Sequence, residues 1–368
     1  MNPVVSLIRD RGPISVAEYM ELALYHPEHG YYASASRRSG RNGDFFTSVD
    51  VGPLFGQLLA VQIAEMWSVL RERGASGFHL VEAGAGDGRL ARDVLDAVAA
   101  ERPDVYEVLR VTLVERSPAA LGRHGELLEP HARRILLESS ATLPHAFTGA
   151  IVANELLDAM PVHVVVMTAH GLCEVHVCAV EGELREVLLP LANDRVEQLL
   201  DRTGVTIPRG VRAEVGLAGA DWIEHASRAL DRGFMVVFDY GHEAAELYSE
   251  AHAAGTLVAY RGHTADSVRW LQTGCCDLTA HVNLTAFRNV AVASGLTPLG
   301  AVDQTYFLTS LGLAARLDDG RGLASVRGRL AARTLILPGG LGSTIKVMAF
   351  GKGVGTPALL GFAAGRVT

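Results

Sequence analysis

Apolar residues near the start of the chain recur at helical spacing. VAEYMELAL fits one face of a helix, and Ser15 with Glu18 fits a capping box, so a helix is predicted from Ser15 to Leu24. The apolar pattern over residues 52–73 predicts a second, longer helix. Between them, HPEHGYYA is expected to form a turn, and the polar, glycine-rich residues 34–44 a loop. The first 75 residues are therefore expected to form a helical N-terminal cap.

Beyond Gly77 the pattern changes to short apolar strands that alternate with helices. Continuous apolar strands separated by helices are typical of a parallel sheet that is covered on both faces. The fold class is therefore predicted to be α/β, with a Rossmann-like sheet. Near the C-terminus, YFLTSLG (306–312) and IKVMAFGKG (345–353) are expected to add a closing antiparallel pair. The predicted parallel strands are FHLVEA (78–83), RVTLVE (110–115), RRILLES (133–139), AIVANE (150–155) and MVVFDYG (235–241).

Two stretches interrupt the alternation of strands and helices. Within residues 161–231, the run HVVVMTAHGLCEVHVCAVEGELREVLLP predicts a β-meander followed by a helix. Residues 255–290 form a loop-rich segment with polar and aromatic side chains. Open α/β sheets bind ligands beyond the carboxyl ends of their strands, so insertions at such points favour a role in substrate binding. The predicted organisation is a cap over 1–75, a core over 76–160 and 232–368, an insertion over 161–231, and a substrate-side insertion over 255–290 within the core.

Composition and charge narrow the class of protein. The chain of 368 residues is 49% hydrophobic and 20% charged, which is typical of a globular protein with a sizeable core. Its net charge of −8 and the lack of basic runs argue against nucleic acid as a partner. The four cysteines are not at metal-ligand spacing, so no metal is expected. No apolar run is long enough to span a bilayer, and the start lacks a signal peptide's apolar core, which predicts a cytoplasmic protein without membrane insertion.

A glycine-rich turn, in LVEAGAGDGRLARDVL, is the main candidate for a cofactor site. Gly84, Gly86 and Gly88 give the spacing G-x-G-x-G, whereas the dinucleotide fingerprint is G-x-G-x-x-G/A. The sixth position is Arg89, where a dinucleotide fold needs a small residue for close helix–strand packing. Asp87 places a carboxylate where it would repel a pyrophosphate at the helix N-terminus. No phosphate-binding G-x-x-x-x-G-K-S/T motif is present, so the turn favours a cofactor without phosphate.

S-adenosyl-L-methionine (SAM) is such a cofactor, since it carries a sulfonium, a ribose diol and an amino-acid end. Glu82 lies at the end of the first strand, where a carboxylate can contact the ammonium group directly or through water. Glu115 lies at the end of the second strand, where a carboxylate can accept hydrogen bonds from both ribose hydroxyls. The alternative for Glu115 is a cap for the turn that follows it, ERSP.

The sequence also resembles the MidA-like class I methyltransferases over nearly its whole length. The resemblance implies a seven-stranded, mostly parallel sheet, SAM as cofactor, and protein-arginine N-methylation on a respiratory complex I-related target. Ala85 and Asp87 depart from the Pro and basic residue that the family usually has, and Asn283 stands where the family tends to have Asp. These departures leave the acceptor open. The matching motifs are HPEHGYY, GDFFTS, VEAGAGDGRLARDVL, LVERSPAAL, VANELLDAMPVH, FDYG, GTLVAYRGH, DLTAHVNLTAF and IKVMAFGKG.

The end of the fourth strand, VANELLDAMP, is the predicted position of the methyl acceptor. Asn154 and Glu155 come directly off the strand, and Asn154 is also a candidate to contact the cofactor. If a helix begins near Glu155, then Glu155 and Asp158 face the same side. Paired carboxylates can orient an arginine guanidinium and accept its proton. The alternative is an asparagine N-cap followed by acidic first-turn residues that stabilise the helix dipole.

Three further segments contribute candidate residues. In GDFFTS, the side chains of Asp44, Thr47 and Ser48 are predicted to hydrogen-bond polar parts of the cofactor, the alternative being an ordinary polar turn. Tyr240, at the end of the fifth strand, is predicted to line the acceptor pocket. His281 is a candidate general base near neutral pH, although such a histidine is more often structural.

Three functions follow from these observations. The first is methylation of an arginine-bearing protein, and the second is O- or N-methylation of a small molecule by an enzyme of the same fold. The third is a non-catalytic SAM-binding assembly factor. A dehydrogenase remains only as a remote alternative, which tight NAD binding without SAM binding would revive. The oligomeric state stays open, a homodimer included.

Overall fold

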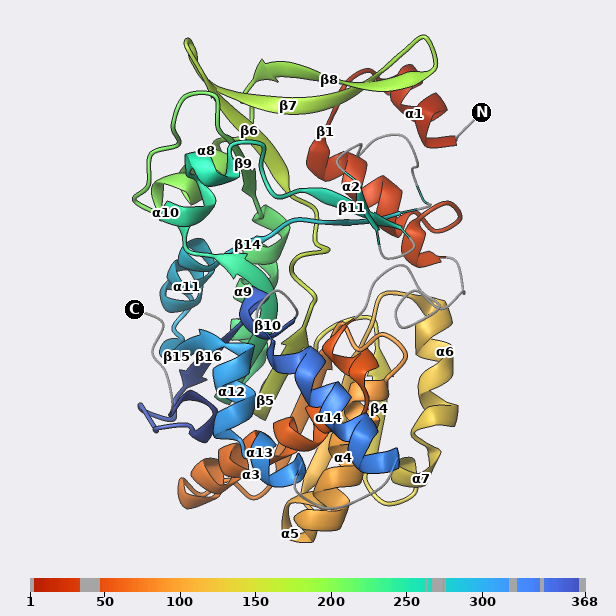
Figure 1. Cartoon of the computed structure of the whole chain (residues 1–368), viewed down its shortest axis with the longest axis vertical. Coiled ribbons are helices and arrows are strands. Elements are labelled where there is room, and N and C mark those ends of the chain that lie inside the picture. Colours follow the sequence, from red (N-terminus) through yellow and green to blue (C-terminus); the bar gives the residue numbers. More distant parts are fainter. Residues whose placement is uncertain are drawn as a thin grey trace. The chain divides into compact units, whose positions relative to one another are not determined.

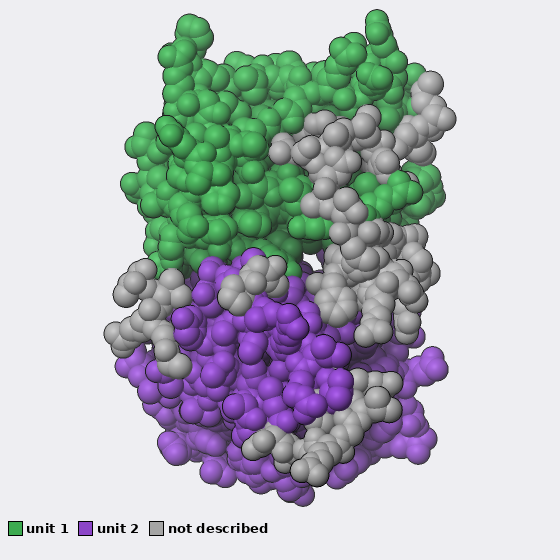
Figure 2. Space-filling view, viewed as in Figure 1, with its two compact units in different colours: residues 1–45, 157–224, 240–290 green, residues 46–156, 225–239, 291–368 purple. Residues whose placement is uncertain are grey.

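The computed structural model describes residues 3–33, 47–261, 264–266, 274, 276–317, 323–337 and 341–363. Contacts along the chain divide it into two compact units (Figure 2). Unit 1 contains residues 1–45, 157–224 and 240–290. Unit 2 contains residues 46–156, 225–239 and 291–368.

The predicted seven-stranded, mostly parallel sheet is confirmed, and it is built in the order β15-β16-β10-β5-β2-β3-β4 (Figure 1). Strand β2 pairs in parallel with β3 and β5, β3 with β4, and β5 with β10, whereas β15 and β16 pair antiparallel. The last residues of β10 pair with the short strand β14 (Val282–Asn283). The strands are β2 (Phe78–Ala83), β3 (Leu109–Val114), β4 (Leu136–Ser140), β5 (Phe147–Asn154), β10 (Leu230–His242), β15 (Thr297–Asp303) and β16 (Ile345–Lys352).

Burial explains why the central strands read as apolar runs. Every residue of β2 is buried, and β10 is buried without interruption from Phe234 to Asp239. Two glycines permit close strand approach, because a Cβ on Gly149 would lie 1.9 Å from the His79 carbonyl oxygen, and one on Gly233 1.8 Å from the Gly149 oxygen. A side chain at either position would require the strands to move apart.

Helices of unit 2 follow the strands along the chain. In the long helix α3, Gly56 approaches α4 so closely that a Cβ would lie 2.6 Å from the Cβ of Asp93. The predicted helix over 52–73 is confirmed as α3. The elements are η2 (Ser48–Val51), α3 (Leu54–Glu72), α4 (Arg89–Glu101), α5 (Pro103–Tyr106), α6 (Pro118–Leu127), α7 (Glu129–Ala132), α12 (Gln304–Ser310), α13 (Leu313–Leu317), α14 (Leu323–Ile336), α15 (Leu341–Thr344) and η4 (Leu360–Phe362).

The predicted strand over 306–312 is wrong, because this segment forms α12 and the turn after it. Its buried residues, Gln304, Phe307, Leu308 and Leu311, follow the i, i+3, i+4, i+7 spacing of a helix face. Strand β16 instead pairs with β15, which precedes α12. The segment contains several residues that favour strands, but the helical spacing of its apolar residues determined its secondary structure.

Unit 1 contains the predicted β-meander, which is confirmed as an antiparallel sheet of five strands. Helix α2 begins as predicted, since the Glu18 backbone N–H donates to Ser15 Oγ at 3.2 Å and the Ser15 N–H donates to Glu18 Oε2 at 2.8 Å. The first elements of the unit are α1 (Pro3–Arg11), β1 (Ile14–Ser15), α2 (Val16–Tyr25), η1 (Tyr31–Ala33), β6 (His163–Thr168), β7 (Gly171–Val180), β8 (Glu183–Pro190), α8 (Asp194–Asp201) and β9 (Arg212–Val215).

The N-terminal segments divide differently from the predicted cap over 1–75. Residues 1–45 belong to unit 1, whereas α3 belongs to unit 2. The reason is that apolar side chains of α2, such as Tyr19 and Leu24, share one core with Val164 and Val175 of the meander. The later elements of unit 1 are α10 (Ala244–Leu247), η3 (Glu250–His252), β11 (Val258–Arg261), β12 (Thr264–Asp266) and β13 (Asp277–Thr279). Two helices, α9 (Leu217–Ala229) and α11 (Leu284–Ala293), each begin in unit 1 and end in unit 2.

Candidate cofactor and acceptor sites

The glycine turn of unit 2 joins β2 to α4 at the point where the strand order of the sheet reverses. From β2 the chain continues to β3 on one side, while β5 lies on the other side and leads to β10, which is where open α/β sheets bind ligands. Gly84, Gly86 and Gly88 all have left-handed backbones, with φ of 71°, 54° and 86°. Gly84 and Gly88 also face Leu156 and Leu113 closely, whereas nothing lies within 4 Å of a Cβ on Gly86. The turn therefore presents an open face at Gly86.

Glu115 lies directly after β3 and holds this turn. Its Oε2 accepts a hydrogen bond of 2.9 Å from the Gly86 backbone N–H, and its Oε1 accepts one of 2.8 Å from Ser117. The contact with Ser117 is the turn cap that the sequence offered as an alternative. Since each carboxylate oxygen can accept two hydrogen bonds, the cap is compatible with a second role in binding ribose hydroxyls.

Glu82 is the most unusual acid of unit 2. Its side chain is buried at 6% exposure, and Oε2 has no hydrogen-bond partner among the described residues. Burial, with smaller contributions from the charges of Asp87, Glu115 and Asp93, raises the pKa of the Glu82 carboxyl to about 8 against the opposing effect of a backbone hydrogen bond from Ala91. A buried carboxyl oxygen without a hydrogen-bond partner is costly, and an ammonium group is the partner that would relieve the cost.

Asn154 presents a second unpaired oxygen in the same unit. It ends β5, which pairs directly with β2, and its Oδ1 is buried without a partner in the described part of the chain. Its Nδ2 donates to Glu155 Oε1 at 3.2 Å. Two buried acceptors without donors, at the ends of neighbouring strands and beside an open glycine, fit the amino-acid end of SAM.

The predicted helix beginning near Glu155 is wrong. Residues 155–160 form bends and a turn, because Glu155 has a left-handed φ of 49° and its N–H still donates to the Phe238 carbonyl of β10 at 2.8 Å. The acidic pair on one helix face and the capping alternative both required that helix. After Leu156 the chain enters unit 1, so Glu155 and Asp158 belong to different units.

Thr47 and Ser48 both make hydrogen bonds to other residues of unit 2. The Thr47 N–H and hydroxyl donate to Asp50 Oδ2, each at 3.0 Å. The Ser48 N–H donates to Glu155 Oε1 at 3.1 Å, and its buried hydroxyl donates to Gln304 Oε1 at 3.0 Å. These hydroxyls therefore already bond to protein groups. The remaining candidate of this motif, Asp44, lies outside the described residues.

Arg89 connects that segment to the glycine turn, a link that the sequence reasoning missed. Its Nη1 lies 2.7 Å from Asp50 Oδ1, and its Nε lies 3.0 Å from Asp87 Oδ1. Asp50 is almost fully buried at 1% side-chain exposure. The only signal in the sequence was an arginine at the turn position where a small residue was expected.

In unit 1 the structure brings Tyr240 and His281 together. Their rings stack with centroids 6.3 Å apart, and the His242 ring lies 5.1 Å from that of His281. Burial, together with the smaller effects of the neighbouring His242 and His252, lowers the pKa of His281 to about 4. The ring is therefore neutral at pH 7, and its weak basicity does not favour the role of general base.

Asp158 lies in a second polar cluster of unit 1. Its carbonyl accepts a hydrogen bond of 2.9 Å from the Ala280 N–H. The partly buried Tyr32 donates its hydroxyl proton to Asp277 Oδ1 at 2.9 Å. The pKa of Tyr32 is raised well above its usual value. Burial is the largest cause, and Asp277, Tyr25 and Asp158 raise it further in that order. Asp277 and Tyr32 were not predicted as site residues, although DLTAH and HPEHGYY contain them.

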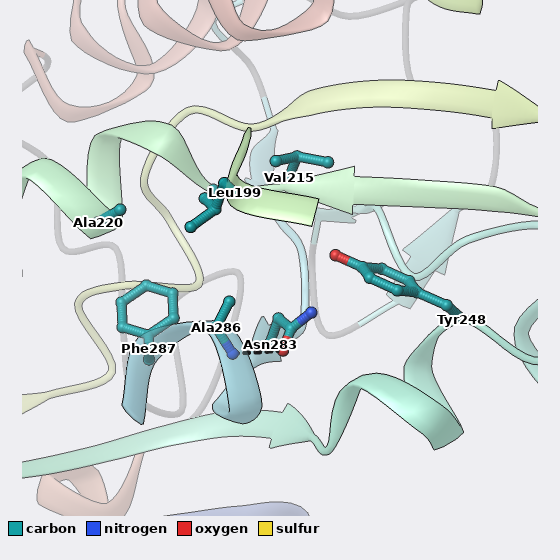
Figure 3. A pocket seen from close by; sticks show the side chains of 8 residues that line it. Leu199, Val215, Ala220, Tyr248, Asn283, Ala286 and Phe287 are labelled. Carbon is teal, nitrogen blue, oxygen red and sulfur yellow. Dashed lines mark hydrogen bonds between the residues drawn. The ribbon is translucent and has the colours of Figure 1, made fainter. Parts of the chain in front are cut away.

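Unit 1 also contains a cavity of about 10 Å³, which has room for about one water molecule. It is too small for a methyl acceptor. Figure 3 shows Asn283 at this cavity, where its Oδ1 accepts a hydrogen bond of 2.9 Å from the Ala286 N–H at the start of α11. The cavity is lined by Leu199, Val215, Gly216, Ala220, Tyr248, Asn283, Ala286 and Phe287.

Across the described ranges, no three His, Cys, Asp or Glu side chains lie close enough together to hold a metal ion. No described helix is long and apolar enough to cross a membrane.

Comparisons with known proteins decide the family. A model of S-adenosyl-L-methionine-dependent methyltransferases matches residues 58–302. The chain belongs to this family. The mouse mitochondrial protein arginine methyltransferase NDUFAF7 is 29% identical over 338 residues, which cover 84% of this chain and 73% of the mouse protein. The human protein of the same name is 29% identical over 352 residues, covering 86% and 75%.

A solved structure agrees on the fold and the cofactor. The crystal structure of a Burkholderia thailandensis protein bound to S-adenosyl-homocysteine superposes with a TM-score of 0.89 at 30% identity, and it covers 99% of this chain and 94% of the other. The chain is therefore a SAM-dependent class I methyltransferase, as the glycine turn and the family resemblance indicated. The resemblance to the MidA-like family is confirmed.

Proposed function

We propose that this methyltransferase transfers the methyl group to an arginine side chain of a protein. The relatives in mouse and human carry the name protein arginine methyltransferase. The observation that supports it in this chain is the carboxylate of Glu155, which lies directly after β5 in unit 2 and is suited to a guanidinium. Guanidinium binds carboxylates in bidentate fashion.

The roles of this chain's residues follow from their contacts. When bound, SAM supplies an electrophilic methyl group on a sulfonium. Glu82 would pair with the ammonium end of SAM. Glu115 would accept hydrogen bonds from the ribose hydroxyls while it also accepts one from the Gly86 N–H. Arginine is protonated at neutral pH, so a carboxylate such as Glu155 would orient the guanidinium and accept the proton that it loses. Most of the rate should come from alignment and exclusion of water.

The test uses SAM with a labelled methyl group and an extract of the source cells. Label in a protein band, recovered as methylarginine after hydrolysis, supports the proposal and identifies the target. Label in the small-molecule fraction overturns it in favour of metabolite methylation. Binding of SAM without transfer to either fraction would point to a non-catalytic assembly factor. Glu155→Gln serves as the control variant, which should bind SAM and lose most of the transfer.

A further inference from the structure

The Gly86 peptide is held by side chains at both of its backbone polar groups. Its N–H donates to Glu115, and its carbonyl oxygen lies 2.8 Å from Nε2 of His124, a fully buried residue of α6. We propose that His124 is a positioning residue for the cofactor, which fixes the Gly86 peptide so that the open face of the turn is preformed for SAM. This role goes beyond the acceptor chemistry and rests on the placement of SAM at the glycine turn.

The partners of His124 place a hydrogen on its Nε2. A carbonyl oxygen can only accept, so Nε2 must carry the hydrogen that is donated to Gly86. On the other side of the ring, Nδ1 lies 2.9 Å from the Ser139 hydroxyl, which can donate to it. A neutral imidazole has one donor and one acceptor, and both are used here. Ser139 of β4 therefore orients the ring that orients the turn.

The ring also packs against the turn. A Cβ on Gly88 would lie 3.3 Å from His124 Cδ2, so the imidazole borders the turn at a second point. Glycine has the largest conformational freedom of any residue, and three glycines in five residues make an intrinsically loose segment. A turn that is already fixed binds its ligand with a smaller loss of conformational entropy. Loss of the His124 contact should therefore reduce cofactor affinity rather than the rate of the bound complex.

The chain offers a matched control histidine in the same unit. His131 of α7 is also buried, and its two ring nitrogens lie 2.8 Å from the Tyr106 hydroxyl and 3.1 Å from Asp96. Neither of these two hydrogen bonds reaches the glycine turn. Replacement of His131 by Leu should lower the melting temperature and leave cofactor affinity unchanged.

The experiment is calorimetric titration of the purified full-length protein with S-adenosyl-homocysteine, with the melting temperature measured in parallel. In His124→Gln the amide nitrogen can occupy the position of Nε2, whereas in His124→Asn it can reach only the position of Nδ1. We expect about tenfold weaker binding for His124→Asn, a loss of no more than about threefold for His124→Gln, and an intermediate loss for Ser139→Ala, since one net hydrogen bond is worth about that much. Turnover at saturating SAM should stay near that of the wild type in all three.

Two outcomes separate the possible failures. Equal affinities of His124→Asn, His124→Gln and the wild type, with Glu115→Ala strongly weakened, would overturn the role of His124 and leave the cofactor site standing. Full affinity in Glu115→Ala would instead show that the turn is not the cofactor site. If His124→Asn does not fold, Ser139→Ala keeps the ring and its packing, and unchanged affinity in that variant overturns the proposal by itself.

Discussion

The carboxyl group of Glu82 should make cofactor binding release a proton. In the protein without ligand, burial and the neighbouring acids raise its pKa to about 8, so the group is mostly neutral at pH 6.5. Pairing with the ammonium end of the cofactor favours the charged form, which requires loss of that proton. We expect release of about one proton per molecule of S-adenosyl-homocysteine bound at pH 6.5, and affinity that rises up to about tenfold per pH unit below pH 8.

The same group should affect stability with the opposite dependence on pH. Because the folded-state pKa of about 8 exceeds the ordinary value of 4.5, the contribution of Glu82 is fully present below pH 4.5 and is lost as the pH rises to about 8. The loss amounts to at most about 5 kcal/mol, a limit that water near the carboxylate reduces. Glu82→Gln cannot ionise. The ligand-free variant should therefore become increasingly more stable than the wild type between pH 4.5 and 8, while it binds S-adenosyl-homocysteine more weakly.

Calorimetric titrations in two buffers of different ionisation enthalpy measure the proton release, and melting curves at several pH values measure the stability. Glu214→Gln is the matched control, because Glu214 is similarly buried but its carboxylate accepts bonds from the Thr256 N–H, the Thr256 hydroxyl and the Leu257 N–H. That variant should lose stability without changing the proton release. The reasoning is refuted if the wild type releases no proton at pH 6.5, or if Glu82→Gln releases as many protons as the wild type.

Three other predictions follow from single positions. Glu155→Gly and Glu155→Ala both remove the carboxylate that accepts from the Ser48 N–H, and both should lose methyl transfer. Glycine relieves the left-handed backbone at φ 49°, so Glu155→Gly should be about 1 kcal/mol more stable to unfolding than Glu155→Ala, and a lower stability would contradict this. Gly149→Ala should destabilise unit 2 by more than about 3 kcal/mol in denaturant unfolding, since its Cβ would lie 1.9 Å from a backbone oxygen, and a cost below about 1 kcal/mol would argue against the strand spacing. His281 should titrate near pH 4 by NMR, so its ionisation costs stability as the pH falls from 6.5 to 4; a midpoint near 6.5 would contradict its burial.

The centre of the sheet was predictable because β2, β5 and β10 are largely buried and therefore read as apolar runs. FHLVEA forms β2 with the expected boundaries, whereas MVVFDYG lies within β10, which begins earlier, at Leu230. The polar residues at the strand ends could be placed for the same reason, since a fixed strand end fixes the position of the next side chain. Glu82 and Asn154 lie at the ends of β2 and β5 as expected, and Glu115 follows β3, while their roles toward the cofactor stay predictions.

Features that depend on contacts between distant segments were not predictable from local patterns. The left-handed backbone at Glu155 leaves no periodic signal, so the acidic residues after β5 read as the first turn of a helix. His124 lies 38 residues from the carbonyl that it contacts, and Arg89 lies 39 residues from Asp50. Such pairs become visible only once the sheet order has brought β3, β4 and the glycine turn to neighbouring positions.

The backbone of Gly86 gives a stronger reason for a phosphate-free cofactor than the charge of Asp87. Asp87 is paired with Arg89, so its repulsion of a phosphate is weaker than the sequence alone indicated. In a dinucleotide fold the N–H groups of the turn and of the helix N-terminus are directed at the pyrophosphate. Here the Gly86 N–H is already donated to Glu115, and the Gly86 carbonyl is bound by His124. A carboxylate at the end of β3 thus occupies the donor that a phosphate would need, and keeps lone pairs suited to the hydroxyls of a ribose.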